Sequence, residues 1–394
     1  MAKRLAIPSD KLKLRIVGPL AYFDVSRVQR FALNKDIPST AIYEIGNNLQ
    51  AGTATDMPAT TLSFSIFDVG IKAFATMTGT NPSLYPAAGV DISSLGEVDA
   101  VVYVRDPTLA VHTKYAHARR LQVRDFTFNY SVGGESTEEY NLVGSASRWF
   151  KKDVVVDLFT VGTTSFTLTQ TPLVLASGNY GLSVITNGSY ETEVTGAPAA
   201  GEYRIVSGTK TLTTGDTRTT VVIAIYYAEV AGGTATYIGD SQMPAAVRGK
   251  DVKIVISANT IPRVQSVSIT GNLNVQEIKE MGNDNIVGYQ RQTPDVTGSL
   301  TVIDTDTELL DLLLWGNINS GHNELEMGVS CIASGVSLDI KIYDPCTDAL
   351  LKTVYIPTIV LTGDSYTANV SQNTTHTLNW RSLTAACKVY SGSR

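Results

Sequence analysis

The chain of 394 residues has no long apolar run and little charge. No stretch approaches the roughly 20 apolar residues that a membrane-spanning helix requires, and residues 1–20 lack the continuous apolar core of a secretory signal. Charged residues make up 17% of the chain and the net charge is −6, so a basic surface for binding nucleic acid is not expected. Because 43% of the residues are hydrophobic, we expect packed cores rather than disorder, and no membrane insertion.

Cysteine and histidine are scarce. An odd number of cysteines, all in the last quarter of the chain, is not the pattern of a disulfide framework and favours folding in a reducing cytosol. These cysteines are Cys331, Cys346 and Cys387. Among the four histidines, His112 and His117 lie five residues apart, which does not match the spacing of two metal ligands on a helix. We interpret them as ordinary surface histidines.

Motifs of the common enzyme classes are absent. The chain has no Cys-x-x-Cys, His-Glu-x-x-His, Gly-x-Ser-x-Gly or phosphate-binding Gly-Lys-Ser/Thr motif. No two carboxylates are spaced so as to suggest acid–base catalysis. Asp304, Asp306 and Glu308 alternate, but no glycine-turned loop follows them, so we interpret them as helix-capping residues rather than calcium ligands. The sequence predicts a protein that is not an enzyme, with no catalytic residue, no metal site and no cofactor.

The chain does contain an internal repeat, which decides the interpretation. Residues 27–68 align without a gap with residues 263–304, and both segments begin with Arg-Val-Gln. Identical pairs along the run include Ile42 with Ile278, Glu44 with Glu280, Gly46 with Gly282, Asn47 with Asn283, Gly52 with Gly288, Pro58 with Pro294 and Asp68 with Asp304. Further along, the offset drifts from 236 to 238 and Asp106-Pro107 meets Asp344-Pro345. Turn residues recur because the same backbone bends recur, so we interpret the chain as a duplicated domain.

This interpretation divides the chain into four parts. They are an N-terminal arm at residues 1–11, a first copy at 12–152, an insert at 153–242 and a second copy at 243–394. The run at 251–257 could open the second copy or close the insert. The insert is rich in Gly, Thr and Val, and its strand-like runs at 165–169, 201–207 and 219–229 are separated by turn signals. This pattern predicts a small, immunoglobulin-like β-sandwich.

Each copy is expected to be a small β domain with one short helix. Residues 28–34 and 60–67 alternate with a period of two, and so do their counterparts near 264–270 and 297–302. We expect Gln29, Phe31 and Leu33 in the first copy, and Gln265, Val267 and Ile269 in the second, on the packed face. The connection at 35–59 is too long for a simple hairpin turn. In the first copy, a helix is expected at 71–77, followed by strands at 99–105, 125–130 and 138–143. In the second copy, the helix is expected at 308–315 and the strands at 338–343, 365–369 and 376–381.

These segments resemble the tail tube, or major tail, proteins of long-tailed bacteriophages. The first copy shows Arg-Val-Gln-Arg-Phe at 27–31, Tyr-Glu-Ile-Gly-Asn at 43–47, Pro58 before a strand, and a closing hairpin at 126–144 with a Gly-Gly turn. The second copy repeats the opening with Glu-Met-Gly at 280–282 and Pro-Asp-Val-Thr-Gly at 294–298, but its closing hairpin carries Asn-Val-Ser-Gln-Asn-Thr from Asn369. The motifs are short, and their order and recurrence carry the resemblance over roughly three quarters of the chain.

The resemblance implies a fold and a mechanism. The fold is mainly β, with two tandem tube-type β-sandwich domains that form a barrel, each with one short helix, plus the inserted β-sandwich. Tube proteins form six-membered rings whose inner strands join into one barrel, and the rings stack into a conduit for genomic DNA. The implied partners are further copies of the chain, the tail tip or baseplate and terminator proteins, and a tape-measure protein in the lumen. The implied location is the virion tail, assembled in the host bacterial cytoplasm.

The resemblance also implies roles for individual residues. The wet faces of the strands would line the channel, and the connections at 35–59 and 271–295 would reach the neighbouring ring. The implied lumen-facing residues are Arg30, Ala32, Asn34, Ser63, Ser65, Ser266, Ser268, Thr270, Ser299 and Thr301. The implied inter-ring residues are Tyr43, Glu44, Gly46, Asn47, Gly52, Pro58, Glu280, Gly282, Asn283, Gly288 and Pro294. Small hydroxyl side chains suit a DNA conduit, because every Lys or Arg contact adds phosphate affinity; Arg30 is the exception.

The duplication changes the expected stoichiometry. If six tube domains close a ring and each chain carries two, three chains suffice, so we expect a trimer with pseudo-sixfold symmetry. The insert would appear three times on the outside, which is easier to accommodate on a non-contractile tail than beneath a sliding sheath. Two alternatives stay open: another tail component, such as a baseplate hub, terminator or sheath-associated protein, or a cell-surface or carbohydrate-binding sandwich whose insert tyrosines stack on sugars.

Overall fold

The structure is a computed structural model. It describes residues 12–43, 50–55, 57–67, 70–80, 85–105, 112–144, 146–151, 153–159, 162–174, 182–186, 188–206, 208–228, 246–282, 286–303, 308–316, 335–370 and 373–394. Strands and antiparallel sheets dominate these residues and helices are few, which confirms the prediction of a mainly β fold. Within them, no helix is long and apolar enough to cross a membrane.

Among the described residues, the two repeats have the same order of elements, apart from one short extra strand after the helix of the first repeat. The first contains β1 (Leu12–Val17), β2 (Tyr22–Val25), β3 (Val28–Asp36), β4 (Ser39–Tyr43), β5 (Gln50–Thr55), β6 (Ala59–Phe67), α1 (Lys72–Met77), β7 (Val90–Asp91), β8 (Glu97–Arg105), β9 (His112–Ser131), β10 (Thr137–Gly144) and β11 (Ala146–Phe150). The second contains β20 (Val252–Ile256), β21 (Asn259–Thr260), β22 (Val264–Asn272), β23 (Val275–Ile278), β24 (Gly288–Arg291), β25 (Asp295–Ile303), α2 (Glu308–Trp315), β26 (Val336–Tyr343), β27 (Leu350–Thr367), β28 (Thr375–Ser382) and β29 (Lys388–Ser391). Strand β20 pairs with β26 as β1 pairs with β8, so residues 252–256 open the second repeat.

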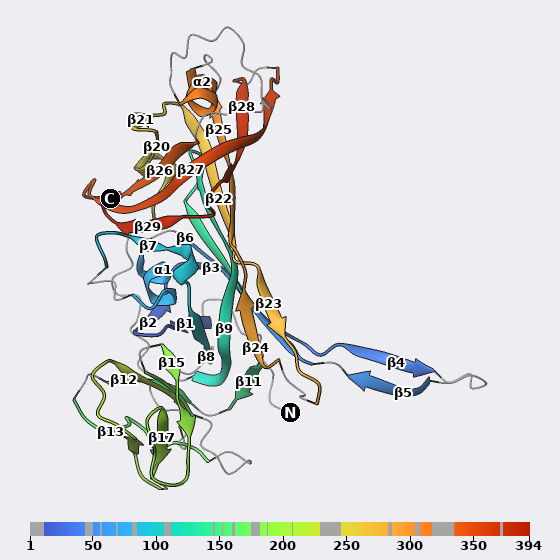
Figure 1. Cartoon of the computed structure of the whole chain (residues 1–394), viewed down its shortest axis with the longest axis vertical. Coiled ribbons are helices and arrows are strands. Elements are labelled where there is room, and N and C mark those ends of the chain that lie inside the picture. The colour runs from blue at the N-terminus through green and yellow to red at the C-terminus, as the bar shows by residue number, and fades with distance from the viewer. Residues whose placement is uncertain are drawn as a thin grey trace.

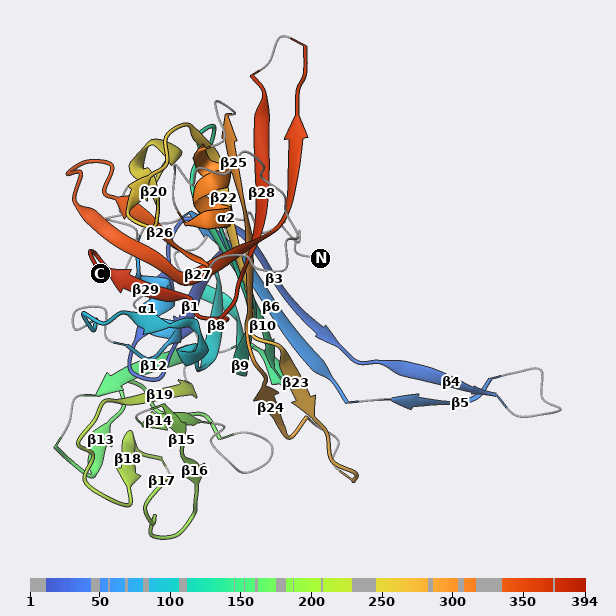
Figure 2. The ribbon, with the colours of Figure 1, turned by 45° about the horizontal axis from the view of Figure 1, so that its top comes forward.

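Strands of both repeats join into one continuous sheet. Eight of them follow one another as β3-β6-β10-β9-β22-β25-β28-β27, each antiparallel to its neighbours. The first four belong to the first repeat and the last four to the second, so the seam between repeats is the pairing of β9 with β22. Figure 2 shows these long strands side by side along the molecule.

The long strands β9 and β27 each take part in two layers. The C-terminal part of β9 pairs with β10 and β22, whereas its N-terminal part pairs with β8 and β11. In the same way, β27 pairs with β28 near its end and with β26 and β29 near its start. The sequence predicted only the ends of these strands, and it predicted neither β11 nor β29.

One face of the eight-stranded sheet is apolar and packs on the main core. Leu62, Phe64, Phe128, Ile269 and Leu300 lie on this face and are buried. The residues between them are mostly Ser, Thr and Asn and lie on the other face. This alternation is typical of a sheet with one packed and one solvated face.

The recurring Arg-Val-Gln triplet makes the same bulge twice. Arg27 and Arg263 both have a positive φ, of 54° and 58°. The side chains of Gln29 and Gln265 then donate hydrogen bonds to the carbonyl oxygens of Arg27 and Arg263, at 3.1 and 3.2 Å. The ladder shifts by one residue at both places, so the adjacent valines pack on the core. The expectation that Gln29 and Gln265 lie on the packed face was therefore wrong, because a bulge reverses the alternation.

The insert forms two packed sheets. Strands β12 (Val154–Phe159), β19 (Val222–Tyr227), β14 (Ser183–Thr186) and β15 (Ser189–Tyr190) make one sheet, and β13 (Ser165–Thr167), β18 (Thr211–Thr214), β17 (Glu202–Ile205) and β16 (Thr192–Glu193) make the other. Side chains from both sheets share one core, and the outer face of the first sheet packs on β1, β8 and β9. Every residue of β19 is buried for this reason. Figure 1 shows the insert at the end of the molecule opposite α2.

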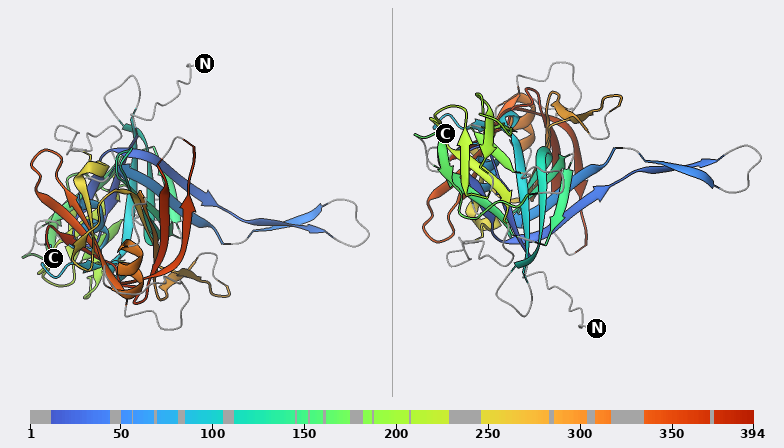
Figure 3. Two further views of the ribbon diagram at one scale, coloured as in Figure 1. Left: turned by 90° about the horizontal axis from the view of Figure 1, so that it is seen from above. Right: turned by 90° about the horizontal axis from the view of Figure 1, so that it is seen from below.

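The predicted connections at 35–59 and 271–295 are hairpin arms rather than plain loops. Strands β4 and β5 form the first arm, which projects far from the body, and β23 and β24 form a shorter second arm. The views from above and below in Figure 3 show that the first arm extends well beyond the outline of the rest of the molecule. The helices lie where the sequence predicts them, and Ile71 is the N-cap residue of α1.

Candidate assembly interface

The seam between β9 and β22 is a complete antiparallel ladder. Ser131 lies opposite Ser266, Asn129 opposite Ser268, and Thr127 opposite Thr270, with the last two hydroxyl oxygens 3.3 Å apart. On the apolar face, Phe126 lies opposite Gly271. A Cβ atom at position 271 would lie 2.3 Å from the Phe126 ring, so only glycine fits there beside that ring.

A buried ion pair also joins the two repeats, on the apolar side of the eight-stranded sheet. The Lys352 ammonium, on β27, donates a hydrogen bond to the Glu138 carboxylate, on β10. The Tyr140 hydroxyl donates to the other carboxylate oxygen at 2.7 Å, and the Lys352 nitrogen lies 5.0 Å from the centre of the Phe128 ring. Lys352 is 1% exposed and Glu138 is 2% exposed. Loss of either side chain would leave the other as an uncompensated buried charge, which is strongly destabilising.

Strand β29 adds a second crossing contact. It pairs with β7 of the first repeat, with Val389 opposite Val90, and the main-chain nitrogen of Ile92 donates to the carbonyl oxygen of Cys387 at 2.9 Å. Burial raises the pKa of the Cys387 thiol well above its ordinary value, so this cysteine is an inert core residue. The two repeats are thus joined by β9 and β22 within the eight-stranded sheet and by β7 and β29 outside it.

The eight-stranded sheet ends at two edges. Among the residues that the structure describes, no strand pairs with the outer edge of β3 or with the outer edge of residues 363–367 of β27. These edges correspond to the two strands of the seam, because β3 occupies in the first repeat the place of β22 in the second, and β27 occupies the place of β9. The eight-stranded sheet therefore begins with a strand equivalent to β22 and ends with a strand equivalent to β9, and β22 and β9 are the two strands that pair at its internal seam.

Burial differs sharply between the seam and the edges. Phe126, Phe128 and Tyr130 of β9 are buried. Their counterparts, at an offset of 238, are Asp364 and Tyr366 of β27 and Ala368 directly after it, and all three are exposed. Tyr366 is 60% exposed. Long exposed edges invite pairing with another chain.

All ten residues that the resemblance assigns to the channel lie on the polar face of the eight-stranded sheet. The register places Arg30 opposite Ser65, Ala32 opposite Ser63, Ser266 opposite Thr301 and Ser268 opposite Ser299, while Asn34 and Thr270 occupy matching positions on β3 and β22. Arg30 shares a row with exposed Glu139, because Ser65 is the partner of both. Arg381 of the same face forms an ion pair with Asp295 at 2.9 Å.

The described residues among those assigned to inter-ring contacts lie on the two arms or at their bases. Tyr43 ends β4 and is 71% exposed, Gly52 lies in β5, Gly288 begins β24, and Gly282 takes a positive φ in the second arm. Pro58 and Pro294 precede β6 and β25, and Glu280 is exposed. Glu44, Gly46, Asn47 and Asn283 lie outside the described residues. The described members therefore lie in two separate hairpins or at the bases of these hairpins.

The second arm is held against the first repeat. The Arg291 guanidinium, at the end of β24, donates to the side-chain oxygen of Gln122 at 2.5 Å and to the carbonyl oxygen of Gly96 at 3.3 Å. Burial lowers the pKa of Arg291. The corresponding position of the first arm is Thr55, which lacks a guanidinium, and that arm projects from the body (Figure 1).

A buried polar network fixes the insert to the first repeat. The Nε2 atom of His117 lies 2.9 Å from one Asp99 oxygen, the Tyr190 hydroxyl donates to the other at 2.7 Å, and His117 Nδ1 lies 3.0 Å from the Tyr227 hydroxyl. Burial raises the pKa of the Asp99 carboxyl, but the interaction with His117, helped by Arg119 and by the hydrogen bond from Tyr190, outweighs this effect and holds that pKa below its ordinary value. His117 is fully buried, so its interpretation as a surface histidine was wrong. The reason is the insert, which covers that face of β9.

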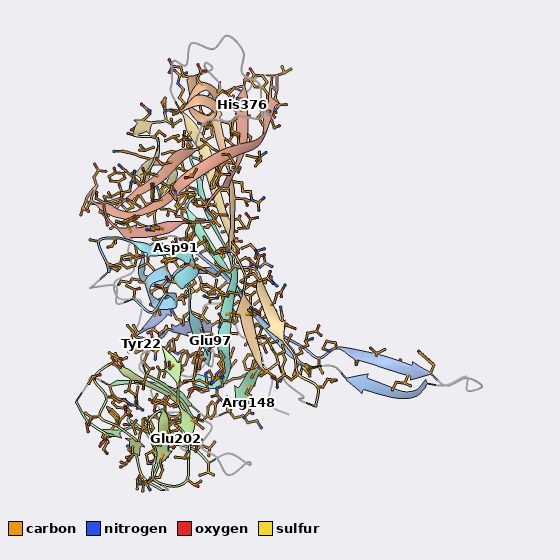
Figure 4. The ribbon with its side chains drawn as sticks, in the orientation of Figure 1. Tyr22, Asp91, Glu97, Arg148, Glu202 and His376 are labelled. Carbon is orange, nitrogen blue, oxygen red and sulfur yellow. The ribbon has the colours of Figure 1, made fainter. Side chains whose placement is uncertain are left out.

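The insert tyrosines are mainly core residues. Tyr203, Tyr226 and Tyr227 are almost fully buried, Tyr190 is partly buried, and Tyr180 lies outside the described residues. In Figure 4, Glu97 and Arg148 mark the region where the insert meets the first repeat, whereas Glu202 lies farther out on the insert. The described part of the chain contains no group of three or more His, Cys, Asp or Glu side chains that could hold a metal ion.

No family model matches the chain, and no curated protein matches it. Among solved structures, it is similar to a chain of "Cryo-EM structure of the anti-feeding prophage (AFP) baseplate, 6-fold symmetrised". That match has a TM-score of 0.29 and 10% identity, and it covers 38% of this chain and 97% of that chain. Neither fold nor function carries over at this level of likeness.

Proposed function

We propose that the protein is a structural virion component, the tail tube protein of a tailed bacteriophage. Three chains close into a ring with pseudo-sixfold symmetry, and stacked rings form the conduit through which genomic DNA leaves the capsid. Its partners are further copies of itself, a tape-measure protein in the lumen, and the tail tip or baseplate and terminator proteins at the ends. It takes no cofactor and performs no chemistry. The tube assembles in the host cytoplasm and ends in the virion tail.

The β9–β22 seam is the observation that carries this proposal. It joins the two repeats edge to edge in one register. The strands at the free edges, β3 and β27, are the equivalents of the seam strands β22 and β9 in the other repeat. A second chain can therefore add at β3 or β27 by the contact that already links the repeats. Three chains of eight strands would close a barrel of about 24 strands, wide enough for an open channel by the scaling of barrel diameter with strand number.

The free edges are complementary when the seam register is applied to them. The register places Phe31 opposite Ala368, Leu33 opposite Tyr366, and Lys35 opposite Asp364. At the existing seam, the last of these positions holds Gly271 and Phe126. The change from a glycine and a ring to a lysine and an aspartate preserves complementarity, because both members of the pair have changed together.

The polar face is suited to a passage for DNA. Serine, threonine and asparagine predominate on it, and Arg124 and Arg381 are paired with Asp125 and Asp295, each at 2.9 Å. A surface with few free cations does not accumulate phosphate contacts. The DNA therefore passes without specific binding.

A disulfide across the open seam tests the proposal. In a background with Cys331→Ser and Cys346→Ser, the pair Ala32→Cys and Thr367→Cys occupies opposite positions in the transposed register. Directly opposite residues of an antiparallel pair have Cα atoms about 4.5–5.5 Å apart, which suits a disulfide. The matched control is Ser268→Cys with Asn129→Cys, the same positions at the existing seam. After oxidation of assembled protein, denaturing electrophoresis should show covalent trimers for the first pair and monomers for the second.

Other results would contradict the proposal. A ladder that continues to six chains would keep the tube and overturn the trimer. Assemblies without any cross-link would overturn the register. If the wild-type protein forms only isolated closed rings, another tail component such as a terminator or hub becomes the better assignment. If it stays monomeric under all conditions, the tube is wrong.

A further inference from the structure

The existing seam contains a pocket for a lysine. The first repeat supplies its walls, with the Glu138 carboxylate, the Tyr140 hydroxyl and the Phe128 ring, and the second repeat supplies Lys352. Next to it, Val389 of β29 is 0% exposed. The inserted side chain therefore belongs to a different repeat from the walls.

The strand registers identify the counterpart of each inserted residue. Lys352 lies opposite Ile342 of β26, and Lys114 lies opposite Val104 of β8, at the same offset of 238. Val389 lies opposite Val354 of β27, and Trp149 lies opposite Ala116 of β9. Lys114 and Trp149 are thus the first repeat's versions of Lys352 and Val389.

The same registers identify the counterpart of the pocket. Phe128 lies opposite Glu138 in the first repeat, and Tyr366 lies opposite His376 in the second. His376 Nε2 lies 2.9 Å from a carboxylate oxygen of Asp364, and the rings of His376 and Tyr366 are in edge contact. The second repeat therefore presents an aromatic ring and a carboxylate, with a histidine orienting the carboxylate. Figure 4 shows His376 near the end of the molecule remote from the insert.

Both halves are exposed in the single chain. Lys114 is exposed and its ammonium lies 4.0 Å from the centre of the Trp149 ring, which belongs to a side chain that is 53% exposed. Tyr366 and Asp364 are exposed on the other edge. A large aromatic residue at a position whose counterpart is fully buried indicates a surface that a partner covers.

We propose, on the basis of the tube function above, that Lys114 of one chain inserts into the pocket formed by Tyr366, Asp364 and His376 of the neighbouring chain. The ammonium lies over the Tyr366 ring and binds the Asp364 carboxylate, His376 holds that carboxylate in place, and Trp149 is buried alongside. Lys35, directly opposite Asp364, brings a second cation to the same acid. The partner is a second copy of this chain.

The two pockets differ in chemistry because one is filled within the chain and the other is filled only on assembly. The Glu138 pocket is filled within the chain, so its carboxylate can be buried. The Asp364 pocket has to remain hydrated until another chain binds, because a buried carboxylate without a cation would destabilise the free chain. An exposed aspartate held by a histidine avoids that cost before assembly and supplies the same negative group afterwards.

A photo-cross-linking residue at position 114 tests the contact directly. In tubes assembled from the full-length chain, p-benzoylphenylalanine at position 114 should cross-link to a peptide of another chain that contains Tyr366 and His376. Mass spectrometry of tubes made from a mixture of isotope-labelled and unlabelled chains identifies this peptide. Tubes whose cross-links are only within one chain, or reach another region, would overturn the inference while leaving the tube function intact. A wild-type protein that forms no tubes would overturn both.

A second variant measures the energetic importance of the contact. Lys114→Met should raise the concentration required for assembly by about tenfold or more, as for a central charged contact at an interface. Lys253→Met is the matched control, because Lys253 is also exposed and also lies over a tyrosine ring, Tyr343, at 4.5 Å. Equal effects of the two variants would contradict the proposal. Trp149 fluorescence should also become less accessible to acrylamide on assembly.

Discussion

The Lys352 ammonium donates a hydrogen bond to the Glu138 carboxylate across the seam between the two repeats. Both side chains are buried, and the Tyr140 hydroxyl and the Phe128 ring complete the surroundings of the pair. Removing one member of such a pair leaves the other charged and buried, whereas removing both leaves no uncompensated charge. The pair therefore makes the docking of the second repeat on the first sensitive to single substitutions.

Lys352→Met should lower the free energy of unfolding by about 3–5 kcal/mol, the usual cost of leaving a buried charge alone. The double variant Glu138→Leu with Lys352→Met should lose less than the single one. Guanidinium denaturation of the full chain measures both, with Lys253→Met as an exposed-lysine control. A loss for Lys352→Met no larger than for the control would show that the pair does not hold the repeats together.

Gly271→Ala should destabilise the seam by about 1–3 kcal/mol, the range for overpacking a core. The added methyl group would lie 2.3 Å from the Phe126 ring. Gly133→Ala is the control, because a Cβ atom there meets nothing within 4 Å. Thermal unfolding compares the two, and adding Phe126→Leu should recover part of the loss at position 271. Equal melting temperatures for the two alanine variants would contradict the close packing at the seam.

Asp99→Asn should weaken the attachment of the insert at neutral pH by about 1–3 kcal/mol, because buried hydrogen bonds to a charged group are lost. The folded-state pKa of Asp99 lies below its ordinary value of 3.8. Its stabilising contribution is therefore complete above that value and disappears as the pH falls through the folded-state pKa. The difference in melting temperature between wild type and variant should thus be largest near pH 7 and shrink in strong acid. A difference that grows on acidification would show that Asp99 is not ionised in the folded protein.

Substitution of the first arm should separate ring formation from stacking. Ile42 and Tyr43 are exposed on β4, so Ile42→Asp with Tyr43→Asp should change the stability of the chain by no more than about 0.5 kcal/mol, as for most surface substitutions. If the arm contacts the next ring, rings should still form but tubes should be much shorter in electron micrographs. Val174→Asp, on the exposed surface of the insert, is the control. Tubes of normal length from the arm variant would exclude an inter-ring role for β4.

Much of this fold follows from local sequence patterns. The alternation at 60–67 and 297–302 predicts β6 and β25 because their hydroxyl residues face solvent and their apolar residues face the core. The recurrence of Gly46, Gly52 and Pro58 at an offset of 236 indicates the duplication without any structure. The ten residues assigned to one wet face do lie on one face of the sheet.

The rest depends on contacts between residues far apart in the chain. Gln29 and Gln265 break the alternation because their side chains bind a backbone carbonyl in a bulge, which periodicity alone does not show. His117 is buried only because the insert packs on β9. The Lys352–Glu138 pair joins residues 214 positions apart, and only a comparison of equivalent positions in the repeats, Lys114 with Lys352, could have pointed to it.

In the proposed tube, the free edges of one chain pair with those of the next as the two repeats already pair within the chain. Cryo-electron microscopy of tubes assembled from the purified full chain tests this most directly. The expected result is rings of three chains, a continuous inner barrel of about 24 strands, β27 of each chain paired with β3 of the next, and three external inserts per ring. Rings of six chains, or three chains joined through any other strands, would contradict it.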